Sequence, residues 1–155
     1  MNLTTRVNSA AAILLTLVAL PAVAGHHDPK FFASPSVGDL KVPFSEAVQV
    51  GPFLFLSGQI GNKPGSRELV PGGIQAETRA TMEKIKAAVE SHGSSMDRVV
   101  KCTVFLADMA EWGAMNEVYV QFFKDHFPAR SAVGSNGLAL GARVEIECIA
   151  AVEEM

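Results

Sequence analysis

Apolar and polar residues follow two distinct periods along this chain. Ile74, Met82, Ile85 and Val89 recur at helical spacing, which predicts a helix over 74–92. Four other segments are rich in β-branched and aromatic side chains, as strands are, and they cover 41–50, 53–57, 99–106 and 144–152. With a second helix between the last two segments, the order predicts an α+β domain, a mixed sheet with two helices on one face.

Turn and cap residues indicate where these elements begin and end. Gly51-Pro52 predicts a turn between two antiparallel strands, and Gly93 predicts the end of the first helix. The second helix is predicted to start at Asp108, with Glu111 completing a capping box, and to end before Pro128. Its apolar stripe is typical of core packing rather than of a cofactor site, and it consists of Trp112, Met115, Tyr119 and Phe122.

Residues 1–24 have the pattern of a secretory signal peptide. Arg6 precedes an almost wholly apolar run over 10–24, which ends in the small residues that a signal peptidase accepts. The run is shorter than the ~20 residues that a membrane-spanning helix needs. The alternative to a cleaved signal peptide is an uncleaved membrane anchor. We therefore predict cleavage before Gly25 and a periplasmic or secreted protein without a membrane segment after cleavage.

The remaining chain is predicted to form one domain. Residues 25–40 are polar and punctuated by proline, and we expect an irregular lead-in there, followed by the domain over 41–155. The net charge of −3 and the pI near 5.8 disfavour a nucleic-acid partner, because such binders carry a basic patch. His26 and His27 lie in the expected tail, so the sequence predicts no metal site.

The two cysteines fall in strand-like segments. Cys102 is expected on the same face as Val100, Val104 and Leu106, and Cys148 aligns with Val144, Ile146 and Val152. This pattern favours buried free thiols that act as small hydrophobic groups. A disulfide is the alternative in an oxidising compartment, but it needs a geometry that the sequence does not specify.

The last quarter of the chain carries candidate chemistry. Arg130 follows Pro128-Ala129, which is interpreted as a turn, and Glu145 begins the last strand with Glu147 on the same face. An arginine can hold an anionic carbon compound, and a carboxylate can position a water beside it. This interpretation requires a fold that brings the two side chains together; otherwise they are a surface arginine and a solvated strand face.

From about residue 42 onward, the chain resembles the RidA family, also called YjgF/YER057c/UK114. The resemblance is carried, in order, by residues 43–48, 57–60, 99–109, 115–119, 127–131 and 144–150. It implies a chorismate-mutase-like fold and a homotrimer around a central sheet barrel, with a site in each cleft between subunits. The activity implied is that of a hydrolase, a 2-iminobutanoate/2-iminopropanoate deaminase-like enzyme, which converts carboxylated enamines and imines of the 2-aminoacrylate type to 2-keto acids and ammonia.

The resemblance also implies residue roles. Arg130 would bind the substrate carboxylate, Glu145 would activate water, and Gly58 would let the backbone approach the ligand. Asn116 corresponds to a polar residue near the family's pocket, although it could equally be a helix or trimer contact. No cofactor and no metal are implied, because an imine is already electrophilic.

Two substrate-binding positions depart from the family pattern. Phe44 stands where active deaminases usually have tyrosine, and Ala132 stands where the family often has cysteine. The glycine-rich segment 134–141 is expected to reshape one rim of the cleft. Together with the expected export, these departures leave open a non-catalytic trimer that binds a small molecule or a protein. Ribonuclease activity, attached to some family members by name, is disfavoured by the acidic pI.

Overall fold

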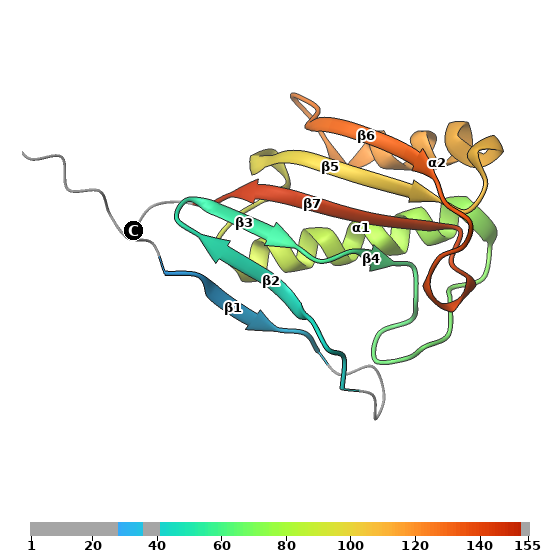
Figure 1. Cartoon of the computed structure of the whole chain (residues 1–155). Helices are drawn as coiled ribbons and strands as arrows, with labels where there is room; N and C mark the ends of the chain where they lie inside the picture. The colour runs from blue at the N-terminus through green and yellow to red at the C-terminus, as the bar shows by residue number, and fades with distance from the viewer. Residues whose placement is uncertain (1–27, 36–40, 153–155) are drawn as a thin grey trace, which may run out of the picture.

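The computed structural model describes residues 28–35 and 41–152, in which a mixed sheet is the central element. The strands are β1 (Lys30–Ala33), β2 (Ser45–Val50), β3 (Phe53–Leu56), β4 (Gln59–Ile60), β5 (Val99–Leu106), β6 (Ala129–Gly134) and β7 (Val144–Ala151). Their spatial order is β1-β2-β3-β7-β5-β6, and β4 pairs with the other end of β7. Among the described strands, β5 and β6 form the one parallel pair, which confirms the mixed sheet (Figure 1).

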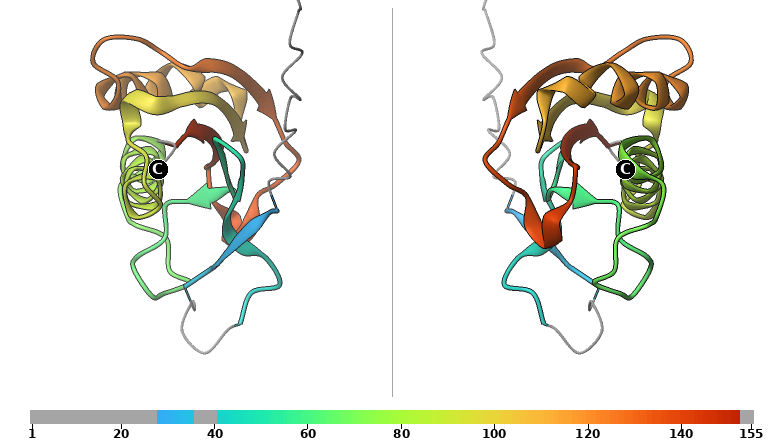
Figure 2. Two further views of the ribbon diagram at one scale, coloured as in Figure 1. Left: turned by 90° about the vertical axis from the view of Figure 1, so that its left-hand side faces the viewer. Right: turned by 90° about the vertical axis from the view of Figure 1, so that its right-hand side faces the viewer.

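Two α-helices cover one face of this sheet. The long helix is α1 (Gly73–Ser91), and α2 (Trp112–Tyr119) is short and flanked by single 3₁₀ turns at Met109–Glu111 and Val120–Phe122. Figures 1 and 2 show α1 running across the sheet and α2 beside β5 and β6. The apolar side of α1 is buried against β7, and this places the core between helices and sheet and leaves the other sheet face open.

The structure confirms the expected turns around the first half of the sheet. Gly51-Pro52 joins β2 to β3, and Gly93 follows α1 with a φ of 78°, a conformation that glycine adopts readily. The strand predicted over 41–50 is β2, and it begins at Ser45 rather than at residue 41. Part of the expected irregular lead-in is also ordered, because β1 pairs antiparallel with β2. The predicted signal segment lies outside the described residues.

The segment after the second helix was misinterpreted from sequence. The residues read as a Pro-Ala turn lead directly into β6, in which Arg130 pairs in register with Cys102 of β5. The strand was missed because small and polar residues dominate it, and a parallel neighbour distant in sequence supplies its pairing.

The second helix is shorter and less buried than predicted. Asp108 accepts a hydrogen bond from the backbone N of Ala110 at 2.9 Å, but this bond caps the 3₁₀ turn before α2, and α2 itself has no side-chain cap. Glu111, however, does not complete the capping box, because its carboxylate pairs with Arg143 instead. Met115 and Tyr119 belong to the core as expected, whereas Trp112 is 42 % exposed.

The cysteines form a disulfide, so the expectation of free thiols was wrong. Cys102 of β5 and Cys148 of β7 lie directly opposite each other, with their Cα atoms 4.1 Å apart, and both are fully buried. A bulge after Val99 explains a second error: Val100 turns to the open face while Val99 and Cys102 face the core. Within the described residues, no helix is long and apolar enough to cross a membrane.

Candidate active site

Three of the residues singled out from sequence line one cavity. Phe44, Gly58 and Glu145 border a cavity of about 710 Å³. The cavity lies where the sheet divides: β2 pairs with β3, whereas β4 pairs with the other end of β7. The floor of the cavity comes from α1 and one rim from Ala139 and Leu140. The glycine-rich segment 134–141 therefore does shape the rim, as its sequence suggested.

Glu145 lies directly beside Gly58. A Cβ added at position 58 would overlap Oε1 of Glu145 and lie 2.9 Å from its Cδ. Glycine at 58 therefore makes room for the carboxylate, a role more specific than the backbone access predicted from sequence. The link before Gly58 is fixed as well, since the backbone N of Ser57 donates to the carbonyl oxygen of Glu46 at 3.0 Å.

The environment of Glu145 favours its neutral form. Burial raises the pKa of this carboxyl above its usual range, and the nearby charge of Glu147 raises it further. Both side chains occupy the open face of β7, as the alternation predicted, because Val144 and Ile146 point into the core. A carboxylate with a raised pKa is a stronger base once it is deprotonated.

Arg130 and Asn116 form a second, separate group. Nη1 of Arg130 donates to Oδ1 of Asn116 at 2.7 Å, so β6 and α2 together orient the guanidinium. The guanidinium carbon lies 4.7 Å from the Tyr119 ring centroid and 5.8 Å from that of Trp112. Among the described residues no carboxylate forms an ion pair with Arg130. Its remaining N–H donors are free to bind an anionic ligand.

The core beneath this arginine is apolar. Tyr119 is buried, its hydroxyl has no hydrogen-bond partner among the described residues, and burial raises its pKa to about 12 against the opposing charge of Arg130. Ala132, on the same face of β6, packs against the core two residues further along. The guanidinium of Arg130 therefore lies against the aromatic rings of Tyr119 and Trp112.

One chain does not bring Arg130 and Glu145 together. Arg130 pairs with the core-facing Cys102, whereas Glu145 pairs with Phe105 and occupies the opposite face. With β5 between their strands and three residues of offset, their Cα atoms are roughly 14 Å or more apart. The condition set from sequence, that the two face each other across a cleft, is not met within a single copy.

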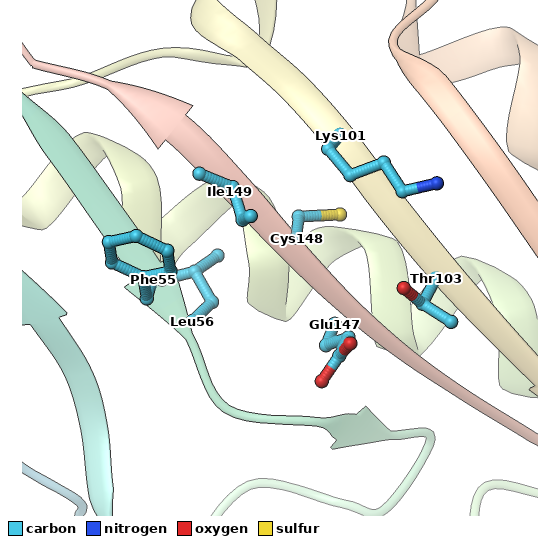
Figure 3. A pocket seen from close by; sticks show the side chains of 7 residues that line it. All are labelled: Phe55, Leu56, Lys101, Thr103, Glu147, Cys148 and Ile149. Atoms are coloured by element: carbon cyan, nitrogen blue, oxygen red, sulfur yellow. The ribbon is translucent and has the colours of Figure 1, made fainter.

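The open face of the sheet carries a second, smaller hollow. Its volume is about 160 Å³, and Figure 3 shows its lining, with Phe55 and Ile149 at one side and Thr103 and Glu147 at the other. None of the site residues predicted from sequence lines it. Phe53 and Phe55 on this face are 45 % and 43 % exposed.

Sequence reasoning missed several residues of the larger cavity. Lys84 reaches it from α1, Glu46 from β2, and Leu140 from the rim, where it adopts a φ of 59°. Neither charge was given a role from sequence: Lys84 lies within the predicted helix, and Glu46 lies within the motif over 43–48. The split between β2 and β4 that exposes them is a tertiary feature.

The chain and its fold match one known family. The family model described as Endoribonuclease L-PSP matches residues 39–152, and the chain belongs to this family, to which the RidA proteins resembled above also belong. The solved structure of RidA from the Antarctic bacterium Psychrobacter sp. PAMC 21119 superposes with a TM-score of 0.72 at 35 % identity, over 79 % of this chain and 99 % of that one. The solved structure of the yeast protein YEO7 superposes with a TM-score of 0.75 at 37 % identity, over 81 % of this chain and 100 % of that one.

Curated relatives carry a more specific name. A Mus musculus protein called 2-iminobutanoate/2-iminopropanoate deaminase is 43 % identical over 108 residues, which are 70 % of this chain and 80 % of that protein. Its Homo sapiens counterpart of the same name is 41 % identical over 108 residues, again 70 % of this chain and 79 % of that protein.

Proposed function

We propose that this protein is a hydrolase that deaminates small carboxylated imines and enamines to 2-keto acids and ammonia. The observation that carries the proposal is the Glu145 carboxylate, which lies beside Gly58 in the wall of a cavity and has its pKa raised by burial. Relatives named 2-iminobutanoate/2-iminopropanoate deaminase support the choice of reaction.

The reaction needs one cation and one base. The guanidinium of Arg130 binds the substrate carboxylate through a pair of parallel N–H donors, while Asn116 holds the opposite side of the guanidinium. Phe44 walls the cavity without the hydroxyl that a tyrosine would add. No residue needs to activate the imine, because its carbon is already electrophilic.

Glu145 handles the protons. Its carboxylate takes a proton from water as the water oxygen bonds to the imine carbon, and the C=N double bond becomes a single bond. The proton then passes to the nitrogen and gives a carbinolamine. Glu145 next transfers the hydroxyl proton of this intermediate to the nitrogen, the C–N bond breaks, and ammonia leaves as the carbonyl of the 2-keto acid forms. An enamine enters the same route after it tautomerises to the imine.

We also propose that the site is shared between copies in a homotrimer. Because Arg130 and Glu145 occupy opposite faces in one chain, Arg130 of one copy must face Glu145 of another. Arg130 is on β6, an edge strand, and the exposed Phe53 and Phe55 on the open face would be covered by assembly. The cleft between subunits then contains one Arg130 and one Glu145.

Export to the periplasm or beyond is a further part of the proposal. The buried Cys102–Cys148 disulfide supports it, because such bonds persist in oxidising compartments and are rare in the cytosol. The substrate there would be an imine formed or released outside the cytosol. Fractionation of cells that express the full-length chain, with the Ala22→Asp and Ala24→Asp double variant as control, tests this part; unprocessed cytosolic wild-type protein would contradict it.

A complementation experiment tests the deaminase and its shared site together. Arg130→Ala and Glu145→Gln are each expected to lose most of the ammonia release from 2-iminopropanoate that a coupled enzyme generates in situ. When equal amounts are unfolded and refolded together, about a quarter of the clefts would hold both native residues, so about a quarter of wild-type activity should return.

The outcomes separate the claims. Wild-type turnover without restoration in the mixture would contradict the shared cleft. No turnover by the wild type would favour the alternative function, a non-catalytic trimer that binds a ligand. The absence of a tyrosine hydroxyl at Phe44 supports this alternative.

A further inference from the structure

An ammonium group for which the described residues supply no ion-pair partner lies in the cavity that holds Glu145. Lys84 projects from α1, and its side chain lines this cavity together with Gly58 and Glu145. Its Nζ donates to the carbonyl oxygen of Ile60 at 3.0 Å and to Oδ1 of Asn62. Both acceptors are neutral, so these bonds hold the amine in place but leave its charge unbalanced.

The described carboxylates do not supply the missing charge. None forms an ion pair with Lys84. Of the two that line the cavity, Glu46 hydrogen-bonds to His92 at 2.9 Å, and Glu145 lies beside Gly58. Burial lowers the pKa of Lys84, as expected for an amine that is withdrawn from water without a partner anion. An anionic group from a ligand would offset this cost.

Lys84 also has a donor to spare. An ammonium carries three N–H groups, and Ile60 and Asn62 accept two of them. Arg67 lines the same cavity as a second cation. The volume of about 710 Å³ lies in the range of sites for ligands far larger than 2-iminopropanoate, so the cavity has room for a longer side chain.

We propose that Lys84 is a second anion-binding point and that the substrates of this protein include 2-imino dicarboxylates such as 2-iminosuccinate. Arg130 of one copy binds the carboxylate next to the imine, and Lys84 of the copy that supplies Glu145 binds the carboxylate at the far end of the side chain. This inference rests on the proposed deamination and names its substrate class. The chemistry is unchanged: water adds to the C=N bond, ammonia leaves, and a 2-keto dicarboxylate forms.

Lys84 is thus a specificity residue rather than a catalytic one, and this distinction decides the experiment. Turnover of 2-iminosuccinate is compared with turnover of 2-iminobutanoate, each generated in situ by a coupled amino-acid oxidase. The enzymes are the wild type, Lys84→Met and Lys84→Arg, with Lys86→Met as the matched control, since Lys86 is on the same helix but exposed and outside the cavity.

We expect Lys84→Met to lower kcat/KM for 2-iminosuccinate about tenfold more than for 2-iminobutanoate, the effect of losing one hydrogen bond to a charged group. Lys84→Arg should keep most of the preference, and Lys86→Met should match the wild type. Equal losses on both substrates in Lys84→Met would overturn the proposal, because they would show that Lys84 only holds Ile60 and Asn62 in place.

Binding of unreactive probes separates this inference from the proposed function. By calorimetric titration, succinate should bind the wild type more tightly than butyrate does, and Lys84→Met should lose that difference. The comparison of succinate with butyrate on the wild type tests the proposal even if Lys84→Met does not fold. If neither imine is turned over, the deaminase proposal fails, while a Lys84-dependent preference for succinate would still support the subsite. Equal affinity of the wild type for succinate and butyrate would overturn the proposal that Lys84 is an anion-binding point.

Discussion

The carboxylate of Glu145 occupies the space in which any residue other than glycine at position 58 would place its Cβ. That Cβ would overlap Oε1 and lie 2.9 Å from Cδ. Position 58 precedes β4, and the residue paired with Glu145 in β7 is Ile60, two positions further on. The orientation of the proposed base therefore depends on a residue without a side chain.

Gly58→Ala should displace Glu145 and lower kcat about 10- to 100-fold, because small misplacements of a catalytic group have effects of this size. The fold should persist, since Gly58 has no positive φ and the carboxylate can move. Gly113→Ala in α2 is the control: its Cβ would meet nothing within 4 Å, so activity should not change. Steady-state ammonia release and thermal melting measure both variants. A fully active Gly58→Ala enzyme would contradict the assignment of Glu145 as the base.

Replacing Arg130 should weaken substrate binding through both charge and geometry. Arg130→Ala is expected to lower kcat/KM about 10- to 100-fold, since a hydrogen bond to a charged group contributes about 1.5–3 kcal/mol. Arg130→Lys should restore only part of this, because an ammonium lacks the planar fork and its alignment by Asn116 and Tyr119. Initial rates over a range of imine concentrations measure the effect. Wild-type kinetics in Arg130→Lys would rule out a bidentate contact.

The pH profile should report the raised pKa of Glu145. The base acts when it is deprotonated, so activity falls as pH decreases through this pKa, and the acid limb should lie above the range of an ordinary glutamate. Glu147→Gln removes a charge that contributes to the shift and should move the limb to lower pH. Measuring kcat/KM from pH 4 to 8 in both proteins tests this. An acid limb that does not move in Glu147→Gln would show that this charge does not act on the base.

The disulfide should contribute substantially to stability. It closes a separation of 46 residues between β5 and β7, for which loop-closure entropy gives about 4 kcal/mol. We expect the Cys102→Ala and Cys148→Ala double variant to unfold at clearly lower denaturant concentration than the wild type. Reductant should lower the midpoint of the wild type but not that of the variant. Equal midpoints in oxidised and reduced wild type would show that the bond does not form in solution.

The sequence by itself determined much of the local structure. The helical period over 74–92, the Gly51-Pro52 turn and the strand over 99–106 all appear where predicted, because each follows from short-range spacing and residue type. Family motifs identified the class of fold. They also pointed to Arg130 and Asn116, which the structure joins by a hydrogen bond, and to Phe44, Gly58 and Glu145, which it brings to one cavity.

Only the tertiary structure decided which of these residues meet. The bulge after Val99 reversed the facing of Val100, and the register of β5 with β7 placed Cys102 against Cys148, although neither feature has a local pattern. The pairing of β6 with β5 set Arg130 on the face opposite Glu145. Strand register and sheet order depend on contacts between segments far apart in the chain. These contacts separate Arg130 from Glu145 and place Lys84 in the cavity that Glu145 lines.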